Sequence, residues 1–173
     1  MQSQAKKVAY SAVFTALGLI LSYVEALIPI NLIIPFPGFK LGLANLAVLL
    51  AFLCLGFSYA CAVSLCRITL SALLFGSVTS FWFSLAGGVL TLGVLLLYKL
   101  FLYKSNGLIG LCVLSAAMHN LGQCLVCAIL FGHYVLTFYL PYLLLFSLIT
   151  GSLTGLISSY FPRLKILTKG VNQ

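Results

Sequence analysis

Long apolar runs, separated by short polar or glycine- and proline-containing segments, make up most of this 173-residue chain. A helix needs about 20 apolar residues to cross the hydrocarbon core of a bilayer, and six runs approach that length. They cover residues 8–28, 41–57, 59–76, 81–101, 108–131 and 135–160. Because the connections are short, the pattern predicts an all-α membrane protein in which residues 1–173 form one domain, a bundle of six transmembrane helices.

Composition supports this class and excludes most enzymes. Only 6% of the residues are charged, against about 25% in soluble domains, and the mean hydropathy is +1.23. Glu25 is the only acidic residue, whereas glycosidases need two carboxylates, hard cations need several oxygen ligands, and a Ser-His-Asp triad needs an acid. We therefore expect no enzymatic activity, no catalytic residues, no metal and no cofactor. The six cysteines lie within apolar runs and are expected to pack as small hydrophobic residues.

The net charge of +8 could suggest a nucleic-acid partner, but the basic residues are placed as in a membrane protein. Apart from Lys40 and Arg67, they form three clusters, before the first apolar run, after the fourth and after the sixth. Cytoplasmic loops carry an excess of lysine and arginine, so these clusters predict that both termini are cytoplasmic. The sequence has no basic stripe interleaved with aromatic residues, and we expect no binding of nucleic acid.

The longest irregular segment, residues 29–40, follows the first predicted helix. Pro29, Pro35, Pro37 and Gly38 preclude a regular helix there, yet the segment remains strongly apolar. Non-helical backbone at membrane depth is tolerated where it is buried in protein or lines a cavity. We favour a long extracytoplasmic loop that folds over the outer mouth of the bundle, and the alternative is a loop that rests on lipid headgroups.

Arg67 lies near the middle of the third apolar run. A cation at that depth costs about 2.5 to 3.5 kcal/mol on insertion scales, so it should face the bundle interior and have a partner. Glu25 is the only anion available. Two interpretations remain open: a buried Arg67–Glu25 pair that orders the helices, or an Arg67 that binds an anionic group of a ligand, with Glu25 holding the guanidinium or reading another ligand group.

The fifth run carries the densest polar cluster. Ser115, His119 and Gln123 are spaced i, i+4 and i+8 and therefore share one face of a helix, while Asn120 lies about 100° round it. A single buried histidine is usually a packed, hydrogen-bonded residue. Several polar side chains on one face favour the alternative, that at least one of them contacts a ligand.

Small residues give a second pattern. Ala5, Ala9, Ala12 and Ala16 form a stripe on the first predicted helix, and Gly151 and Gly155 form a GxxxG motif on the sixth. Such stripes let helix backbones approach closely. The stripe on the first helix is either packing within the bundle or a docking surface for a second membrane protein. Gly87 and Gly88, which follow Trp82, are likewise either packing residues or a flexible point beside a ligand.

Five motifs in order resemble one known family. They are Glu25-x-x-Ile-Pro29, Pro37-Gly-Phe-Lys40-Leu-Gly42-Leu-Ala-Asn45, Arg67, Ser84-Leu-Ala-Gly-Gly88 and His119-Asn-Leu-Gly-Gln123. This arrangement is similar to that of the Gx transporters, whose older name is heptaprenyl diphosphate synthase component I. The resemblance implies a fold like that of the substrate-binding S components of energy-coupling factor (ECF) transporters, six-helix proteins of the bacterial cell membrane that capture vitamins beneath the loop between the first two helices. They dock through an alanine-rich face of the first helix onto a transmembrane coupling protein bound to two ATPases.

The resemblance implies a substrate-binding membrane subunit that captures a small organic solute from outside, and the excess of cations favours an anionic, vitamin- or precursor-like solute. The residues expected to converge on it are Glu25, Lys40, Asn45, Arg67, Trp82, His119, Asn120 and Gln123. The alternative is a non-catalytic membrane subunit of an isoprenoid or quinone pathway, in which Arg67 and Lys40 would grip a diphosphate. Without any aspartate, the chain lacks the aspartate-rich motifs of polyprenyl synthases, and without a P-loop it would depend on a partner for ATP hydrolysis.

Overall fold

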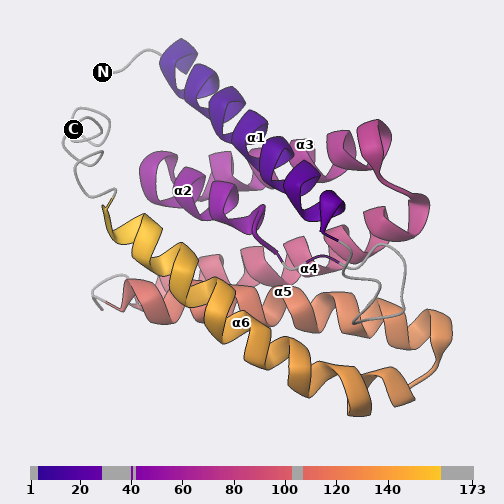
Figure 1. Ribbon diagram of the computed structural model, residues 1–173. Helices are drawn as coiled ribbons and strands as arrows, with labels where there is room; N and C mark the ends of the chain where they lie inside the picture. Colours follow the sequence, from indigo (N-terminus) through magenta and orange to yellow (C-terminus); the bar gives the residue numbers. More distant parts are fainter. Residues whose placement is uncertain (1–3, 29–39, 41, 103–106, 161–173) are drawn as a thin grey trace.

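Helices form almost all of the described chain in the computed structural model, which describes residues 4–28, 40, 42–102 and 107–160. Figure 1 shows α1 (Gln4–Leu27), α2 (Asn45–Leu55), α3 (Phe57–Phe75), α4 (Val78–Leu97), the short π-helix η2 (Tyr98–Leu102), α5 (Leu108–Phe131) and α6 (Tyr134–Tyr160). The predicted all-α bundle is confirmed, and the start of α5 and the ends of α5 and α6 match the apolar runs. Of the predicted loop, residues 29–40, all but Lys40 lie outside the described residues.

Five of these helices are long and apolar enough to cross a membrane, and α2 is the shorter exception. The prediction of a second full-length span over residues 41–57 is therefore wrong. Eleven residues of α-helix extend about 16 Å, roughly half the hydrocarbon core. Gly42 stops the helix from starting earlier because its φ of +87° is in the left-handed region, which an α-helix cannot contain.

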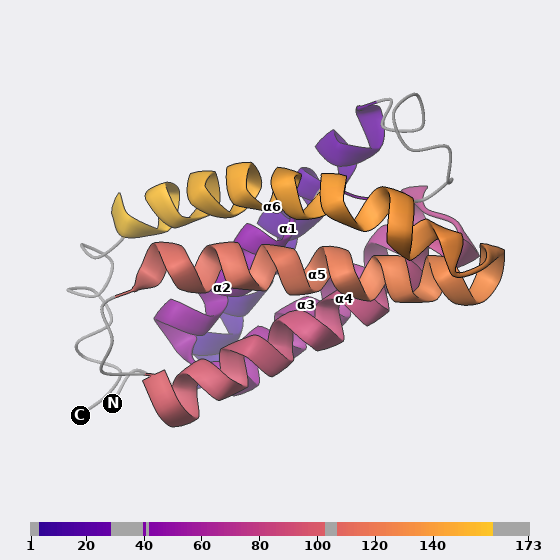
Figure 2. The ribbon, with the colours of Figure 1, turned by 90° about the horizontal axis from the view of Figure 1, so that it is seen from below.

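The bundle has two sides. On one side α5 packs between α4 and α6, and on the other α1, α2 and α3 contact one another, with α3 against α4 joining the two. Figure 2 shows α4, α5 and α6 as neighbouring elements, and in Figure 1 α1 begins and α6 ends on the same side of the molecule.

Glycines allow the closest helix contacts. A Cβ atom on Gly151 would lie 2.5 Å from the Cα of Val113, and one on Gly155 would lie 3.0 Å from the Cα of Ile109. The GxxxG motif of α6 is therefore filled by α5. The structure therefore supports packing within the bundle as the role of this motif.

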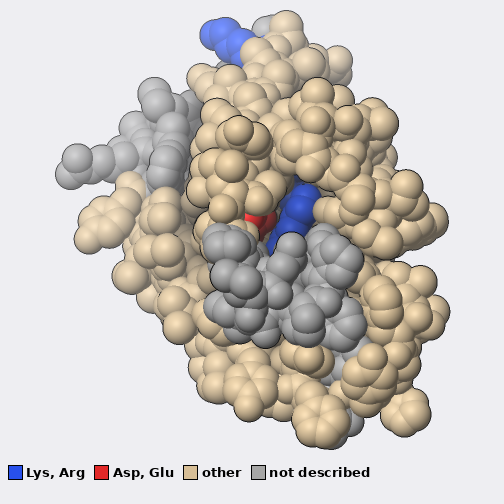
Figure 3. Space-filling view, turned by 45° about the vertical axis from the view of Figure 1, so that its right-hand side comes forward, with Lys and Arg blue, Asp and Glu red and all other residues tan. Residues whose placement is uncertain are grey.

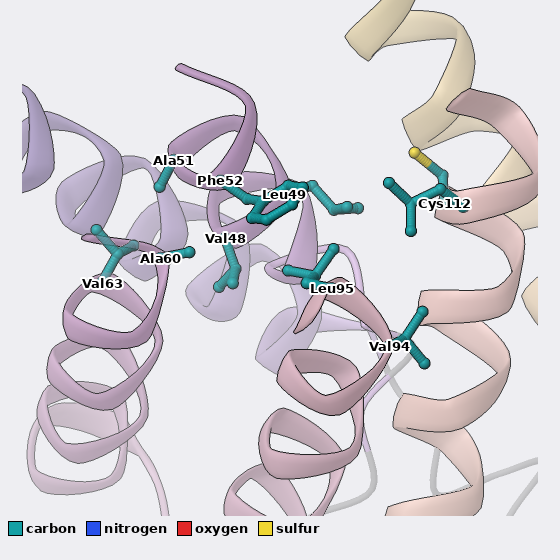
Figure 4. Close-up of a cluster of buried hydrophobic side chains, with 10 residues drawn as sticks. Val48, Leu49, Ala51, Phe52, Ala60, Val63, Val94, Leu95 and Cys112 are labelled. Atoms are coloured by element: carbon teal, nitrogen blue, oxygen red, sulfur yellow. The ribbon is translucent and has the colours of Figure 1, made fainter. Parts of the chain in front are cut away.

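A hydrophobic cluster occupies the part of the bundle where α2 lies (Figure 4). Leu49 and Phe52 of α2 pack there with Val63 of α3, Leu95 of α4 and Cys112 of α5. Cys112 thus packs as a small hydrophobic residue, as expected. Outside this cluster the core carries buried polar residues, among them Ser22 of α1, Arg67 of α3, Ser84 of α4 and His119 of α5.

Candidate ligand-binding site

The backbone just before α2 is fixed to α5 by a side-chain amide. The Lys40 N–H donates to Gln123 Oε1 at 2.9 Å, and Gln123 Nε2 donates to the Lys40 carbonyl oxygen, also at 2.9 Å. Both residues are buried. This two-way pairing brings Lys40, which is distant in sequence, against the polar face of α5.

Two further contacts fix the segment between Lys40 and α2. A Cβ atom on Gly42 would lie 3.3 Å from His119 Cδ2, so the missing side chain lets the backbone lie close to the imidazole. The Leu43 N–H donates to Glu25 Oε1. Ala44, the residue that precedes α2, has no side chain that can cap the helix. The N-terminus of α2, which carries partial positive charge, therefore begins among buried polar groups contributed by α1 and α5.

Arg67 of α3 reaches the same region between α1 and α2. Its aliphatic stem passes so close to α1 that a Cβ atom on Gly18 would lie 2.6 Å from Arg67 Cδ and 3.3 Å from Ala47 Cβ of α2. Only 2% of the arginine surface is exposed. Nη1 donates to Ser22 Oγ at 3.5 Å, which is a long and weak hydrogen bond. Nε and Nη2 have no hydrogen-bond partner among the residues that the structure describes.

Three charges interact within this region. Glu25 lies close enough to Arg67 and Lys40 for their charges to affect it. Lys40 lies in the connection between α1 and α2, and burial lowers its pKa; the nearby Arg67 charge lowers it further, while Glu25 acts in the opposite direction. The site therefore combines two cationic groups and one carboxylate in a largely desolvated position.

Buried polar groups are nearly always hydrogen-bonded in folded proteins, yet many here have no partner. Within the described ranges, such atoms include Glu25 Oε2, both side-chain amide atoms of Asn45, His119 Nδ1 and the hydroxyl groups of Ser84 and Ser115. Each unsatisfied buried group costs about 1 to 3 kcal/mol. A concentration of them around an incomplete arginine is the pattern expected of a site that a polar ligand completes.

A small part of the charged cluster is visible on one face of the molecule. In Figure 3, red acidic atoms and blue basic atoms lie together at the bottom of a hollow between tan and grey residues. Because Glu25 is the only acidic residue of the chain, the hollow reaches the site described above.

Six of the eight predicted ligand-binding residues are gathered around the start of α2: Glu25, Lys40, Asn45, Arg67, His119 and Gln123. Hydrogen bonds, electrostatic interactions and close contacts at glycines connect five of these residues with one another or with the segment before α2. The sixth, Asn45, is the first residue of α2.

The other two predicted residues do not lie with this group in the same way. Asn120 is buried beside His119, but its Nδ2 donates to the Leu143 carbonyl oxygen at 2.9 Å and thereby ties α5 to α6. Trp82 is 52% exposed and contacts Phe81 edge to face. It lies on the side of α4 opposite Ser84 and Gly87, both of which are buried, because offsets of two and five residues turn a side chain about 200° and about 140° round the helix.

Sequence reasoning missed two small residues that shape the site. Gly18 and Ser22 are, with Glu25, the buried residues of α1, and their i, i+4, i+7 spacing on an otherwise apolar helix is a signal that could have found them. Gly87 of α4 accommodates the imidazole, since a Cβ atom there would lie 2.6 Å from His119 Nδ1. This contact supports close packing, rather than a flexible point, as the role of Gly87.

The profile of one known protein family matches most of the chain. The sequence profile of the family described as heptaprenyl diphosphate synthase component I matches residues 14–161, which include all six gathered residues. No curated protein and no solved structure matches the chain significantly. Because the profile covers most of the sequence, this apolar helical chain belongs to the heptaprenyl diphosphate synthase component I family.

Proposed function

We propose that this protein is the substrate-binding membrane subunit of an ECF-type transporter, which captures a small organic anion from outside a bacterial cell for uptake. The observation that carries the proposal is the buried arginine with two unsatisfied donor atoms beside the start of a short helix. Short helices that end near the middle of a membrane bundle commonly direct their positive N-termini at anionic substrate groups in transporters. Binding and reorientation, rather than chemistry on the solute, are the expected activity.

The charges of the site favour an anionic solute. Lys40 and Arg67 are opposed by Glu25 alone, which leaves one formal positive charge in a buried position. An uncompensated buried charge is strongly destabilising. A monoanionic ligand would neutralise it.

Energy for uptake would come from partner proteins, because the sequence has no P-loop. The alanine stripe of α1 is a suitable docking surface: Ala5, Ala9, Ala12 and Ala16 are all exposed. They lie on the side of α1 away from Gly18, Ser22 and Glu25, its buried residues. Unlike the glycines of α6, these alanines are not covered by any helix of the described residues, which favours docking over internal packing. We propose that the stripe contacts a transmembrane coupling protein bound to two ATPases.

The first experiment is native mass spectrometry of the detergent-purified protein, with identification of any small molecule released on unfolding. The proposal predicts a bound organic anion. Vesicles that contain the protein, its coupling protein and the two ATPases should then accumulate the same compound when supplied with ATP on the cytoplasmic side. Release of no compound, together with ATP-independent or absent uptake, would contradict the proposal.

A second candidate function is suggested by the name of the family, heptaprenyl diphosphate synthase component I. The chain would then be a non-catalytic membrane subunit of an isoprenoid or quinone pathway, with Lys40 and Arg67 binding a diphosphate. Co-purification of a prenyl diphosphate, and faster prenyl elongation by a soluble synthase when this subunit is added, would favour that function.

A further inference from the structure

We infer that the solute carries a carboxylate, bound by the free edge of Arg67, and a separate N–H or O–H donor, bound by Glu25 Oε2. This inference rests on the proposed function, because it names the chemical class that the same site would take. It also specifies two groups of the ligand rather than its charge alone.

The free atoms of Arg67 have the arrangement that a carboxylate needs. Nη1 is directed at Ser22 Oγ, and the two atoms without partners in the described chain, Nε and Nη2, share one edge of the planar guanidinium. Two N–H groups on one edge match the two oxygens of a carboxylate or phosphate in a bidentate contact. The stem of the side chain packs so closely on Gly18 of α1 that a Cβ atom there would lie 2.6 Å from Arg67 Cδ, and this contact restricts the position of the guanidinium before a ligand arrives.

Charge favours a carboxylate over a phosphate. The formal charges of Lys40, Arg67 and Glu25 sum to +1, and one carboxylate would bring the buried site to neutrality. A diphosphate carries at least two negative charges, and it would leave excess negative charge beside Glu25. Like charges in a desolvated position repel strongly, so the site is poorly suited to that group.

The free oxygen of Glu25 indicates that the ligand has a second polar group besides its anionic group. Its Oε1 accepts the Leu43 N–H, whereas Oε2 has no partner in the part of the chain that is described. An ionised carboxylate can only accept hydrogen bonds. The group that completes Oε2 must therefore be a donor, and a hydroxyl or amine on the ligand would supply it without adding negative charge.

The inference can be tested on the wild-type protein in lipid nanodiscs by NMR of the arginine Nε–H groups. The chain has two arginines, Arg67 and Arg163, so two signals are expected, and the variant Arg67→Lys assigns one by removing it. The probes are three matched pairs: acetate with glycolate, propionate with β-hydroxypropionate, and butyrate with γ-hydroxybutyrate. Inorganic phosphate and pyrophosphate form a separate arm.

We expect the carboxylates to shift the Arg67 signal saturably while the Arg163 signal stays in place. At least one hydroxy acid should bind about two- to tenfold more tightly than its parent, the range of one net hydrogen bond. This advantage should disappear in Glu25→Gln, in which a donor replaces an acceptor. Both phosphate probes should bind more weakly than the best carboxylate.

Three results would overturn the inference: no carboxylate moves the Arg67 signal, no hydroxy acid binds more tightly than its parent, or a phosphate probe binds most tightly. Tightest binding by pyrophosphate would support the isoprenoid alternative instead. If Glu25→Gln does not fold, the wild-type pairs still decide the question. These results are separable from failure of the proposed function, which is judged by the released compound and by ATP-dependent uptake.

Discussion

At the scale of single residues, the candidate site depends on small side chains that let large polar ones approach. Gly18 provides space for the stem of Arg67, and Gly42 and Gly87 lie against His119. At Gly42 the positive φ adds a second constraint, because residues with a Cβ atom rarely adopt it. These contacts position the polar groups before any ligand binds.

Gly87→Ala should therefore displace His119, since the new Cβ would lie 2.6 Å from Nδ1 and 2.8 Å from the His119 carbonyl oxygen. We expect the free energy of unfolding to fall by about 1 to 3 kcal/mol, the usual cost of overpacking a core, with weaker ligand binding. Gly93 is the matched control on α4, because a Cβ atom there would have nothing within 4 Å. Gly93→Ala should leave stability unchanged or raise it by up to about 1 kcal/mol, because alanine has the higher helix propensity. Thermal unfolding in detergent measures both variants, and equal stability would contradict this packing.

Single-residue chemistry predicted much of the site, since burying Arg67 in a membrane is too costly to be incidental and the spacing of His119 and Gln123 put them on one face. It failed for Trp82, because an aromatic residue on an apolar helix suits lipid, protein and ligand equally well. It also could not show that the Asn120 amide bonds Leu143 of α6, because that contact depends on how α5 and α6 pack.

At the scale of elements, α1 has two different faces. Gly18, Ser22 and Glu25 face the bundle, whereas Ala12 and Ala16 are exposed on the other side. The 18-residue apolar window of α1 is only 17% buried, the lowest value among the five long helices. An uncovered face of small residues is suited to close packing against another membrane helix.

The double variant Ala12→Leu and Ala16→Leu should fold and bind solute normally but lose association with the coupling protein. The reason is that bulky side chains would keep the two helices apart, while the site lies on the opposite face. Co-purification of the complex from membranes in which all subunits are produced measures the loss. Ala26→Leu, at another exposed alanine of α1, is the control and should retain the complex. Full recovery of the complex with the double variant would show that the stripe does not dock.

The element that sequence patterns misjudged is α2. The apolar run that contains α2 begins at residue 41, four residues before the helix does. Hydropathy alone cannot show where within the run the helix starts. The start is determined by the positive φ of Gly42 together with tertiary contacts, namely the pairing of Lys40 with Gln123 and the hydrogen bond from Leu43 to Glu25. These contacts join residues 83 and 18 positions apart, which local periodicity cannot detect.

At the scale of the whole molecule, the orientation in the membrane follows from the distribution of charge. Three basic clusters coincide with one side of the predicted topology, and α1 begins and α6 ends on one side of the bundle. The turn between α3 and α4, at Gly76 and Ser77, lies near the end of α1 rather than its beginning, because Phe75 contacts Tyr23. We therefore expect that turn to face outward.

Cysteine accessibility in intact cells tests this orientation, in a background from which the six native cysteines have been removed. Ser77→Cys should react with a membrane-impermeant reagent added outside. Lys104→Cys should react only after the membrane is permeabilised, because position 104 belongs to a basic cluster. Labelling of position 104 from outside would reverse the predicted topology.

The central claim is that the polar cluster around Arg67 exists to bind a solute rather than to order the helices. Calorimetric titration of the co-purified compound into wild type, Arg67→Met, and the double variant Arg67→Met with Glu25→Leu separates these roles, with Gly93→Ala as the control. If Arg67 binds the ligand, Arg67→Met should lose about 2 to 5 kcal/mol of binding free energy. Adding Glu25→Leu should not restore the affinity. If Arg67 only balanced Glu25, replacing both with apolar residues would be neutral or stabilising. Wild-type affinity in the double variant would then contradict the account.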